Sequence, residues 1–201
     1  MIRAFIAVLL PVQVLQKIAA ACQKLQPRLP NVRWVAASNL HFTLKFLGDI
    51  EESKVAAIGD ALAERLRPFP RCTINAKGLG VFPDPKRPRI LWVGLAGSEP
   101  IALASLVEGT LEPLGFMPEK RSLKPHLTIG RWRQSDRPPK DFADELVKWR
   151  DAEFGQFQAG EVFIIRSVLQ PQGAQYHKLR SIPLGIGSTT TEVMKERRDG
   201  R

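Results

Sequence analysis

Hydrophobic and polar positions alternate along several short segments of the chain, and elsewhere they recur every three or four residues. Alternating or short apolar runs predict strands, and the longer spacing predicts helices. We expect helices over 12–25, 53–66, 100–114 and 141–150. We expect strands over 3–10, 33–35, 41–47, 72–81, 89–95, 126–132, 154–158, 161–169 and 175–183. This mixture predicts an α+β fold with antiparallel pairing in part of its sheets.

One short pattern occurs in both halves of the chain. His41-Phe42-Thr43-Leu44 begins one predicted strand, and His126-Leu127-Thr128-Ile129 begins another. The two starting positions, 41 and 126, are 85 residues apart. An internally duplicated, two-lobed fold accounts for such a repeat.

The repeated pattern places an imidazole and a hydroxyl on the same face of a strand. Residues i and i+2 of a strand share a face, so His41 projects with Thr43 while Phe42, Leu44 and Phe46 point to the buried face. The second strand repeats this arrangement. If the two strands line a cleft between the lobes, two imidazoles and two hydroxyls converge in it.

This set of side chains suits phosphoryl transfer without a metal ion. Histidine titrates near neutrality, so one imidazole can act as a general base while the other, protonated, acts as a general acid. Threonine hydroxyls can donate hydrogen bonds to phosphate oxygens. A cation is also expected, and Arg131 and Lys45 are the nearest candidates. Strict alternation puts Arg131 on the face opposite His126, unless the strand ends or twists at Gly130.

Other readings of the histidines are weaker. A single strand histidine followed by threonine is usually structural, and only the repetition makes a functional interpretation preferable. A metal site is disfavoured because two histidines lack a clear third ligand. His177 lacks the pattern and is expected to be an ordinary residue.

The charge of the chain favours a polyanionic partner. Its 201 residues include 30 Lys and Arg against 20 Asp and Glu, which gives a formal net charge of +10. Such an excess fits nucleic acid or a membrane surface. No apolar run is long enough to span a bilayer, and no basic amphipathic helix or leader is recognised, so nucleic acid is preferred.

Cys22 and Cys72 are too few for a disulfide scaffold, which fits a reducing cytoplasm.

The basic residues concentrate beside the second motif and in a proline-rich loop. The sets are Lys86, Arg87 and Arg89 in the loop, and Lys120, Arg121, Lys124, Arg131, Arg133, Arg137 and Lys140, with the single acid Asp136, around the motif. A solvated surface explains such runs equally well, but their position favours steering of an RNA backbone. Trp34 and Trp132 flank the motifs and are candidates for base stacking, although core positions are the more common role.

The motif blocks resemble those of the 2H phosphoesterase superfamily. The first block is Val32-Arg33-Trp34-Val35 followed by the segment from Asn39 to Gly48, and the second runs from Lys124 to Arg131. The RNA 2′,3′-cyclic phosphodiesterase branch, also called 2′-5′ RNA ligase, is the most similar. This resemblance covers roughly residues 1–184 and implies a bilobal, pseudo-two-fold α+β fold with two antiparallel sheets lining a central cleft and helices outside.

The resemblance also implies residue roles. His41 would be the proton donor to the O3′ leaving group, and His126 the proton acceptor from water. Thr43, Thr128 and Arg131 would hold the phosphate, without metal or nucleotide cofactor. The product would be a 2′-phosphate, and a 5′-hydroxyl in place of water would give a 2′-5′ linkage. The pseudo-symmetry leaves the acid and base roles nearly interchangeable.

We therefore expect residues 1–186 to form one bilobal domain, followed by a flexible tail over 187–201. The expected protein is a cytoplasmic monomer that acts on RNA ends bearing a 2′,3′-cyclic phosphate, tRNA-like ends among them. Two alternatives stay open. One is a related enzyme acting on small cyclic nucleotides or ADP-ribose cyclic phosphate, and the other is a non-catalytic RNA-binding module.

Overall fold

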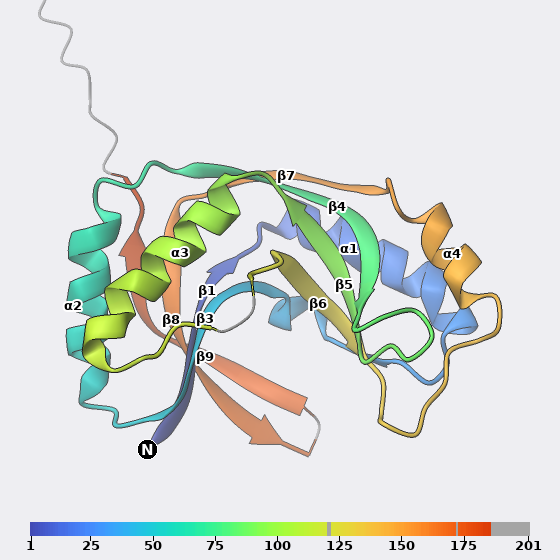
Figure 1. Cartoon of the computed structure of the whole chain (residues 1–201), viewed down its shortest axis with the longest axis horizontal. Coiled ribbons are helices and arrows are strands. Elements are labelled where there is room, and N and C mark those ends of the chain that lie inside the picture. Colours follow the sequence, from blue (N-terminus) through green and yellow to red (C-terminus); the bar gives the residue numbers. More distant parts are fainter. Residues whose placement is uncertain (120–121, 172, 186–201) are drawn as a thin grey trace, which may run out of the picture.

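The computed structural model describes residues 1–119, 122–171 and 173–185 (Figure 1). Its α-helices are α1 (Val12–Leu25), α2 (Lys54–Leu66), α3 (Glu99–Leu111) and α4 (Phe142–Lys148). These match the predicted segments, except that α4 ends at Lys148 instead of 150 and α3 ends earlier and continues as a 3-10 turn over Glu112–Leu114. Gly115 follows in the left-handed conformation, which ends the turn. The expected domain boundary at residue 186 and the tail beyond it lie outside the described residues.

The strands of the described residues form one nine-stranded sheet. They are β1 (Ile2–Leu9), β2 (Arg33–Trp34), β3 (His41–Ile50), β4 (Cys72–Phe82), β5 (Ile90–Ala96), β6 (His126–Arg131), β7 (Glu153–Ala159), β8 (Glu161–Gln170) and β9 (Gly173–Pro183). The order is β7-β4-β5-β6-β3-β1-β8-β9, with β2 paired to β6, and neighbouring strands run antiparallel.

This order contains the predicted duplication. Reading outward from the middle, β3-β1-β8-β9 forms one half and β6-β5-β4-β7 the other. The halves meet where Phe42 of β3 pairs with Leu127 of β6, the same place in each motif. The α+β class and its bilobal, duplicated form are confirmed. The two expected sheets are joined through this pair into one curled sheet (Figure 1).

The two faces of the sheet have different surroundings. Phe42, Leu44, Leu127 and Ile129 are buried in the main core, together with the apolar faces of the helices. A separate small cluster of Phe5, Ala7 and Ile165 lies apart from that core. Because Phe5 stacks on the ring of His41, this cluster marks the face that carries the motif histidines. The main core thus supports the motif strands from behind.

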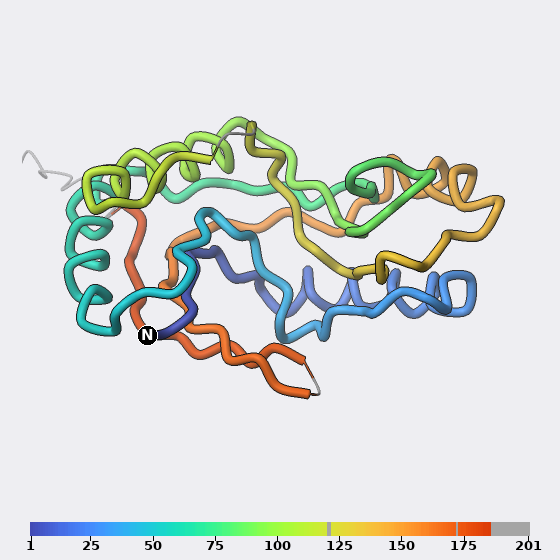
Figure 2. Tube along the Cα trace, turned by 60° about the horizontal axis from the view of Figure 1, so that its bottom comes forward, coloured from blue at the N-terminus to red at the C-terminus, as the bar shows by residue number. Residues whose placement is uncertain are grey.

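Each half of the sheet is covered by one helix from each repeat. Helix α1 follows β1 but packs on β7 of the other half, and α3 follows β5 but packs on α2 and β3. Figures 1 and 2 show the same exchange, with α2 and α3 at one end of the molecule and α1 and α4 at the other. The lobes are therefore interlocked, and neither is a contiguous half of the chain.

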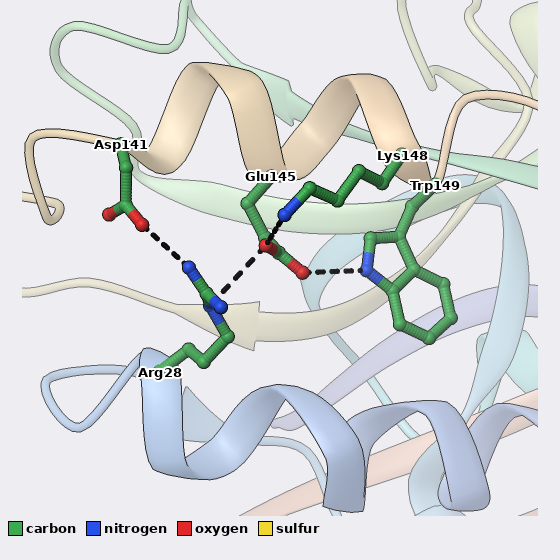
Figure 3. Close-up of polar contacts among 5 residues, drawn as sticks. All are labelled: Arg28, Asp141, Glu145, Lys148 and Trp149. Carbon is green, nitrogen blue, oxygen red and sulfur yellow. Dashed lines mark hydrogen bonds and ion pairs between the residues drawn. The ribbon is translucent and has the colours of Figure 1, made fainter.

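A buried carboxylate connects α4 to the 3-10 turn Gln26–Arg28 that follows α1 (Figure 3). Glu145, only 9% exposed, accepts hydrogen bonds from Trp149 Nε1 at 3.1 Å and Lys148 Nζ at 3.1 Å. Its third partner is the Arg28 guanidinium, whose Nε lies 3.3 Å from Glu145 Oε2, and Arg28 also pairs with Asp141. Several charge-assisted bonds to one carboxylate offset the cost of burying it.

Candidate active site

The two motif strands lie side by side at the centre of the sheet. The pairing of Phe42 with Leu127 is antiparallel, so the residues on either side of this pair also face one another. The facing pairs are His41 with Thr128 and Thr43 with His126. The structure thus brings together the two histidines and two threonines predicted from the repeated motif. In the register of the two strands, each motif histidine is thus opposite the threonine of the other repeat.

Both imidazole rings are oriented by the backbone. Nδ1 of His41 lies 2.8 Å from the carbonyl oxygen of Asn39, and Nδ1 of His126 lies 2.7 Å from that of Lys124. A carbonyl oxygen can only accept, so Nδ1 of each ring must carry a proton and donate it. Nε2 is then the titrating atom and is left for a substrate. The same i to i−2 contact in both repeats gives both histidines the same tautomer.

The surroundings of both histidines disfavour their charged forms. Burial lowers the pKa of His41 and of His126 from the usual 6.5, and the backbone contacts at Nδ1 only partly oppose this. The positive charge of Arg131 lowers both values further. The charge of His126 additionally lowers the pKa of His41. The two rings and Arg131 therefore lie close enough to influence one another's charge.

Arg131 reaches this face through a β-bulge. Along β5, Trp92 pairs with Thr128 and Leu91 with Gly130, so Ile129 is one extra residue in β6. A bulge shifts the alternation by one position. Gly130 is consequently buried and Arg131 is exposed on the face of His126. Strict alternation would have pointed Arg131 away from the face of His126. The bulge interrupts the alternation next to Gly130, where the sequence indicated that the strand could end or twist.

A bulge of the same kind in β3 changes the predicted position of Phe46. On β1, Ala7 pairs with Thr43 and Ile6 with Lys45, so Leu44 is the extra residue in β3. Phe46 is 63% exposed instead of buried, and its ring lies 6.2 Å from that of Phe5 on the histidine face. The prediction that Phe46 belongs to the buried face is wrong because of this bulge.

Lys45 forms an ion pair with helix α3. The bulge turns it toward α3, where it is 4% exposed and its Nζ donates to Glu108 Oε1 at 2.8 Å and to the carbonyl oxygen of Met117 at 2.6 Å. Although burial alone would raise the pKa of the Glu108 carboxyl, hydrogen bonds from Lys45 and the Glu119 backbone hold it below its usual range. Its ion pair fixes β3 to α3, which favours a structural role for Lys45 over the expected contact with substrate.

Aromatic rings enclose each histidine, and sequence reasoning missed them. His41 lies between Phe5 and Tyr176, with ring centroids 4.6 Å and 5.2 Å away. His126 lies 5.0 Å from Phe82 and 6.5 Å from Trp92. These residues come from strands distant in the sequence, and only their position beside the motif strands in the folded sheet identifies them.

The other sequence-predicted candidates have mixed positions. Trp132 is buried against Phe142, which is the core role, and Trp34 is half-buried. Both Cys22 and Cys72 are buried free thiols, as expected. Of the two predicted basic sets, Lys86, Arg87, Lys124, Arg131, Arg133, Arg137 and Lys140 are exposed and Arg89 is half-buried, whereas Lys120 and Arg121 lie outside the described segments.

Two features are absent from the described residues. No group of three or more His, Cys, Asp or Glu side chains within 1–119, 122–171 and 173–185 is arranged to hold a metal ion. No helix in the same ranges is long and apolar enough to cross a membrane.

The fold and the paired histidine motifs define a two-histidine phosphoesterase. Residues 8–92 match the family model described as LigT like Phosphoesterase. An RNA 2′,3′-cyclic phosphodiesterase of Methanothermobacter thermautotrophicus is 34% identical over 176 residues, which are 87% of this chain and 95% of the relative. The chain therefore belongs to the LigT-like family of the 2H phosphoesterase superfamily.

Solved structures have the same fold. TT0787 of Thermus thermophilus superimposes with a TM-score of 0.76 at 27% identity, over 92% of this chain and all of the other. Escherichia coli LigT complexed with 3′-AMP gives a TM-score of 0.73 at 26% identity, over 91% of this chain and 98% of the other. The match in both structures spans the two halves of the sheet.

Proposed function

We propose that this protein is an RNA 2′,3′-cyclic phosphodiesterase that hydrolyses the cyclic phosphate at an RNA end to a 2′-phosphate. The observation that carries the proposal is the pair of imidazoles on adjoining antiparallel strands, each with Nδ1 bound to a backbone carbonyl and Nε2 left for substrate. The relatives named RNA 2′,3′-cyclic phosphodiesterase support the same substrate class.

The proposed reaction needs one proton taken and one given. His126 accepts a proton from water through Nε2 as the water oxygen forms a bond to phosphorus. The bond from phosphorus to O3′ breaks, and Nε2 of protonated His41 donates a proton to the departing O3′. Thr43 and Thr128 donate hydrogen bonds to the non-bridging oxygens, and Arg131 balances their negative charge. The product carries a 2′-phosphate and a free 3′-hydroxyl.

The near-symmetry of the two motifs makes the reverse assignment of the two histidines a second candidate. Both rings have Nδ1 bound to a backbone carbonyl, and burial lowers the pKa of each. A nucleoside 2′-(4-nitrophenyl phosphate) decides between them, because its phenolate leaves without protonation. With this substrate His41→Ala should retain activity close to wild type if His41 is the donor, whereas His126→Ala should retain it if the roles are reversed.

The test of the proposed function uses an oligonucleotide that ends in a 2′,3′-cyclic phosphate, with EDTA present. Wild-type protein should release a 2′-phosphate end, and His41→Ala and His126→Ala should lose this activity while their circular dichroism stays that of a folded protein. Small cyclic nucleotides and ADP-ribose cyclic phosphate are assayed in parallel. Binding without turnover between about pH 5 and 9 would favour the RNA-binding alternative.

The finer expectations belong to the same proposal. We infer that the protein acts as a cytoplasmic monomer on RNA ends, tRNA-like ends included, without a cofactor. The exposed basic residues around the second motif support an RNA partner because they would attract its backbone. A 5′-hydroxyl oligonucleotide supplied with the cyclic-phosphate end would reveal any 2′-5′ ligation.

A further inference from the structure

A small pocket adjoins His41 on the side away from the second motif. Its volume is about 80 Å³, and it lies between β9 and the loop that precedes β3. The polar side chains that line it are Ser38, Asn39, His41, Tyr176 and Lys178. No residue of β5 or β6 contributes to its wall. The pocket is therefore a neighbour of the proposed phosphate site and not a part of it.

The wall formed by β9 is fixed relative to His41. Nδ2 of Asn39 donates to the carbonyl oxygen of Ala174 at 2.7 Å, which ties the β8–β9 hairpin to the loop before the motif. Tyr176 packs edge-on against the His41 ring at 5.2 Å. Figure 2 shows this hairpin projecting from the body of the molecule. A segment of chain leaving the site past His41 would run along it.

Lys178 provides a positive charge at this wall. Its Nζ lies 4.7 Å from the centroid of the Phe163 ring, a cation–π contact that restrains the long side chain. Among the described residues Lys178 forms no ion pair with a carboxylate, whereas Arg180, two residues later on the same strand, pairs with Asp60. An ammonium without a carboxylate partner beside amide and hydroxyl groups suits a phosphate oxygen.

We propose that this pocket binds the phosphodiester that joins the terminal nucleotide of the substrate to the preceding one. The inference rests on the proposed function, since it requires the cyclic phosphate to lie between His41 and His126. The rest of the RNA must then leave the site, and the pocket with Lys178 is the cationic recess that adjoins His41. The pocket thereby selects RNA ends over cyclic mononucleotides.

The test compares kcat/KM for uridine 2′,3′-cyclic phosphate with that for a dinucleotide ending in the same group. We expect wild type to prefer the dinucleotide about tenfold and Lys178→Gln to lose most of that preference. The variant should also flatten the dependence of log kcat/KM for the dinucleotide on log salt by about 0.7, the value for one phosphate contact. Lys178→Arg should restore the preference.

Two controls separate the inference from a general loss of activity. A dinucleotide with a neutral methylphosphonate between its nucleosides should behave with wild type as the mononucleotide does. Lys24→Gln, which removes an exposed lysine on α1, should leave both kcat/KM values unchanged. An unaltered preference in Lys178→Gln, or an equal loss on both substrates, would overturn the inference. If wild type hydrolysed neither substrate, the proposed function would fail and the inference with it.

Discussion

Phe46 and Arg131 occupy equivalent places in the two halves of the sheet. Each lies three residues beyond a motif threonine, and each is exposed because one extra residue interrupts the alternation before it. The burial patterns of the two strands agree position by position from the histidine onward. The two repeats thus share a β-bulge, but the bulge exposes an aromatic ring, Phe46, in the first half and a guanidinium, Arg131, in the second. The site is therefore electrostatically asymmetric, with Arg131 as its cation.

Removal of Arg131 should affect both rate and pH dependence. If the guanidinium stabilises charge on the phosphate oxygens, Arg131→Gln should lower kcat/KM about 10²- to 10³-fold. Because the charge of Arg131 lowers the pKa of both histidines, its loss should move the pH–rate profile to higher pH. Arg65→Gln, on exposed surface of α2, is the matched control and should change neither quantity. If Arg131→Gln were slower but its pH–rate profile were unshifted, the claim that the charge of Arg131 lowers the pKa of both histidines would be contradicted.

The pH dependence of the wild type follows from the same groups. Catalysis with one protonated and one neutral imidazole uses the singly protonated pair, which is most abundant between the two apparent pKa values. Burial and Arg131 lower both values from 6.5, so each imidazolium forms only at lower pH. The profile of kcat/KM, which reports the free enzyme, should therefore peak below pH 6.5 and decline toward alkaline pH. A maximum above pH 7 would contradict this prediction, because it would mean that the lowered pKa values of His41 and His126 do not set the pH dependence of kcat/KM.

Much of this architecture could be predicted from the chain. The periodicity predicts the helices closely, because each has an apolar face and α1, α2 and α3 end near a Pro or Gly. The repeated motif located both histidines and both threonines, since the period of a strand decides which side chains share a face. These are local properties, and a local pattern is enough to predict them.

The bulges could not be predicted in this way. The segment from Phe42 to Phe46 satisfies simple alternation, and only the pairing of β3 with β1 reveals that Leu44 is an extra residue. That single residue moves Lys45 into an ion pair and Phe46 onto the histidine face. The Asn39 contact with Ala174 is similarly hidden, because the two residues are 135 positions apart and meet only in the folded sheet.

The structural role of Lys45 gives a prediction opposite to that of a phosphate ligand. Lys45→Met removes the ammonium that Glu108 and the Met117 carbonyl share, so the free energy of unfolding should fall by about 1–3 kcal/mol. Activity per folded molecule should stay within about twofold of wild type. Urea unfolding, combined with Glu108→Gln and the double variant, measures the coupling between the two side chains. If Lys45→Met had normal stability but lost its activity, Lys45 would instead act as a substrate ligand.

The buried carboxylate at α4 predicts a stability effect that depends on pH. Hydrogen bonds from Lys148 and Trp149, and then the charge of Arg28, lower the pKa of Glu145 from its usual 4.5. A carboxyl with a depressed pKa stabilises the folded state above the unfolded value, and this contribution disappears as the pH falls through the folded value. Glu145→Gln should therefore cost about 1–3 kcal/mol at neutral pH and progressively less below pH 4.5. Urea unfolding across this pH range should show the gap closing. Asp144→Asn, on the exposed side of the same helix, should change stability by no more than about 0.5 kcal/mol. A gap that persisted in acid would mean that Glu145 acts through packing and not through its charge.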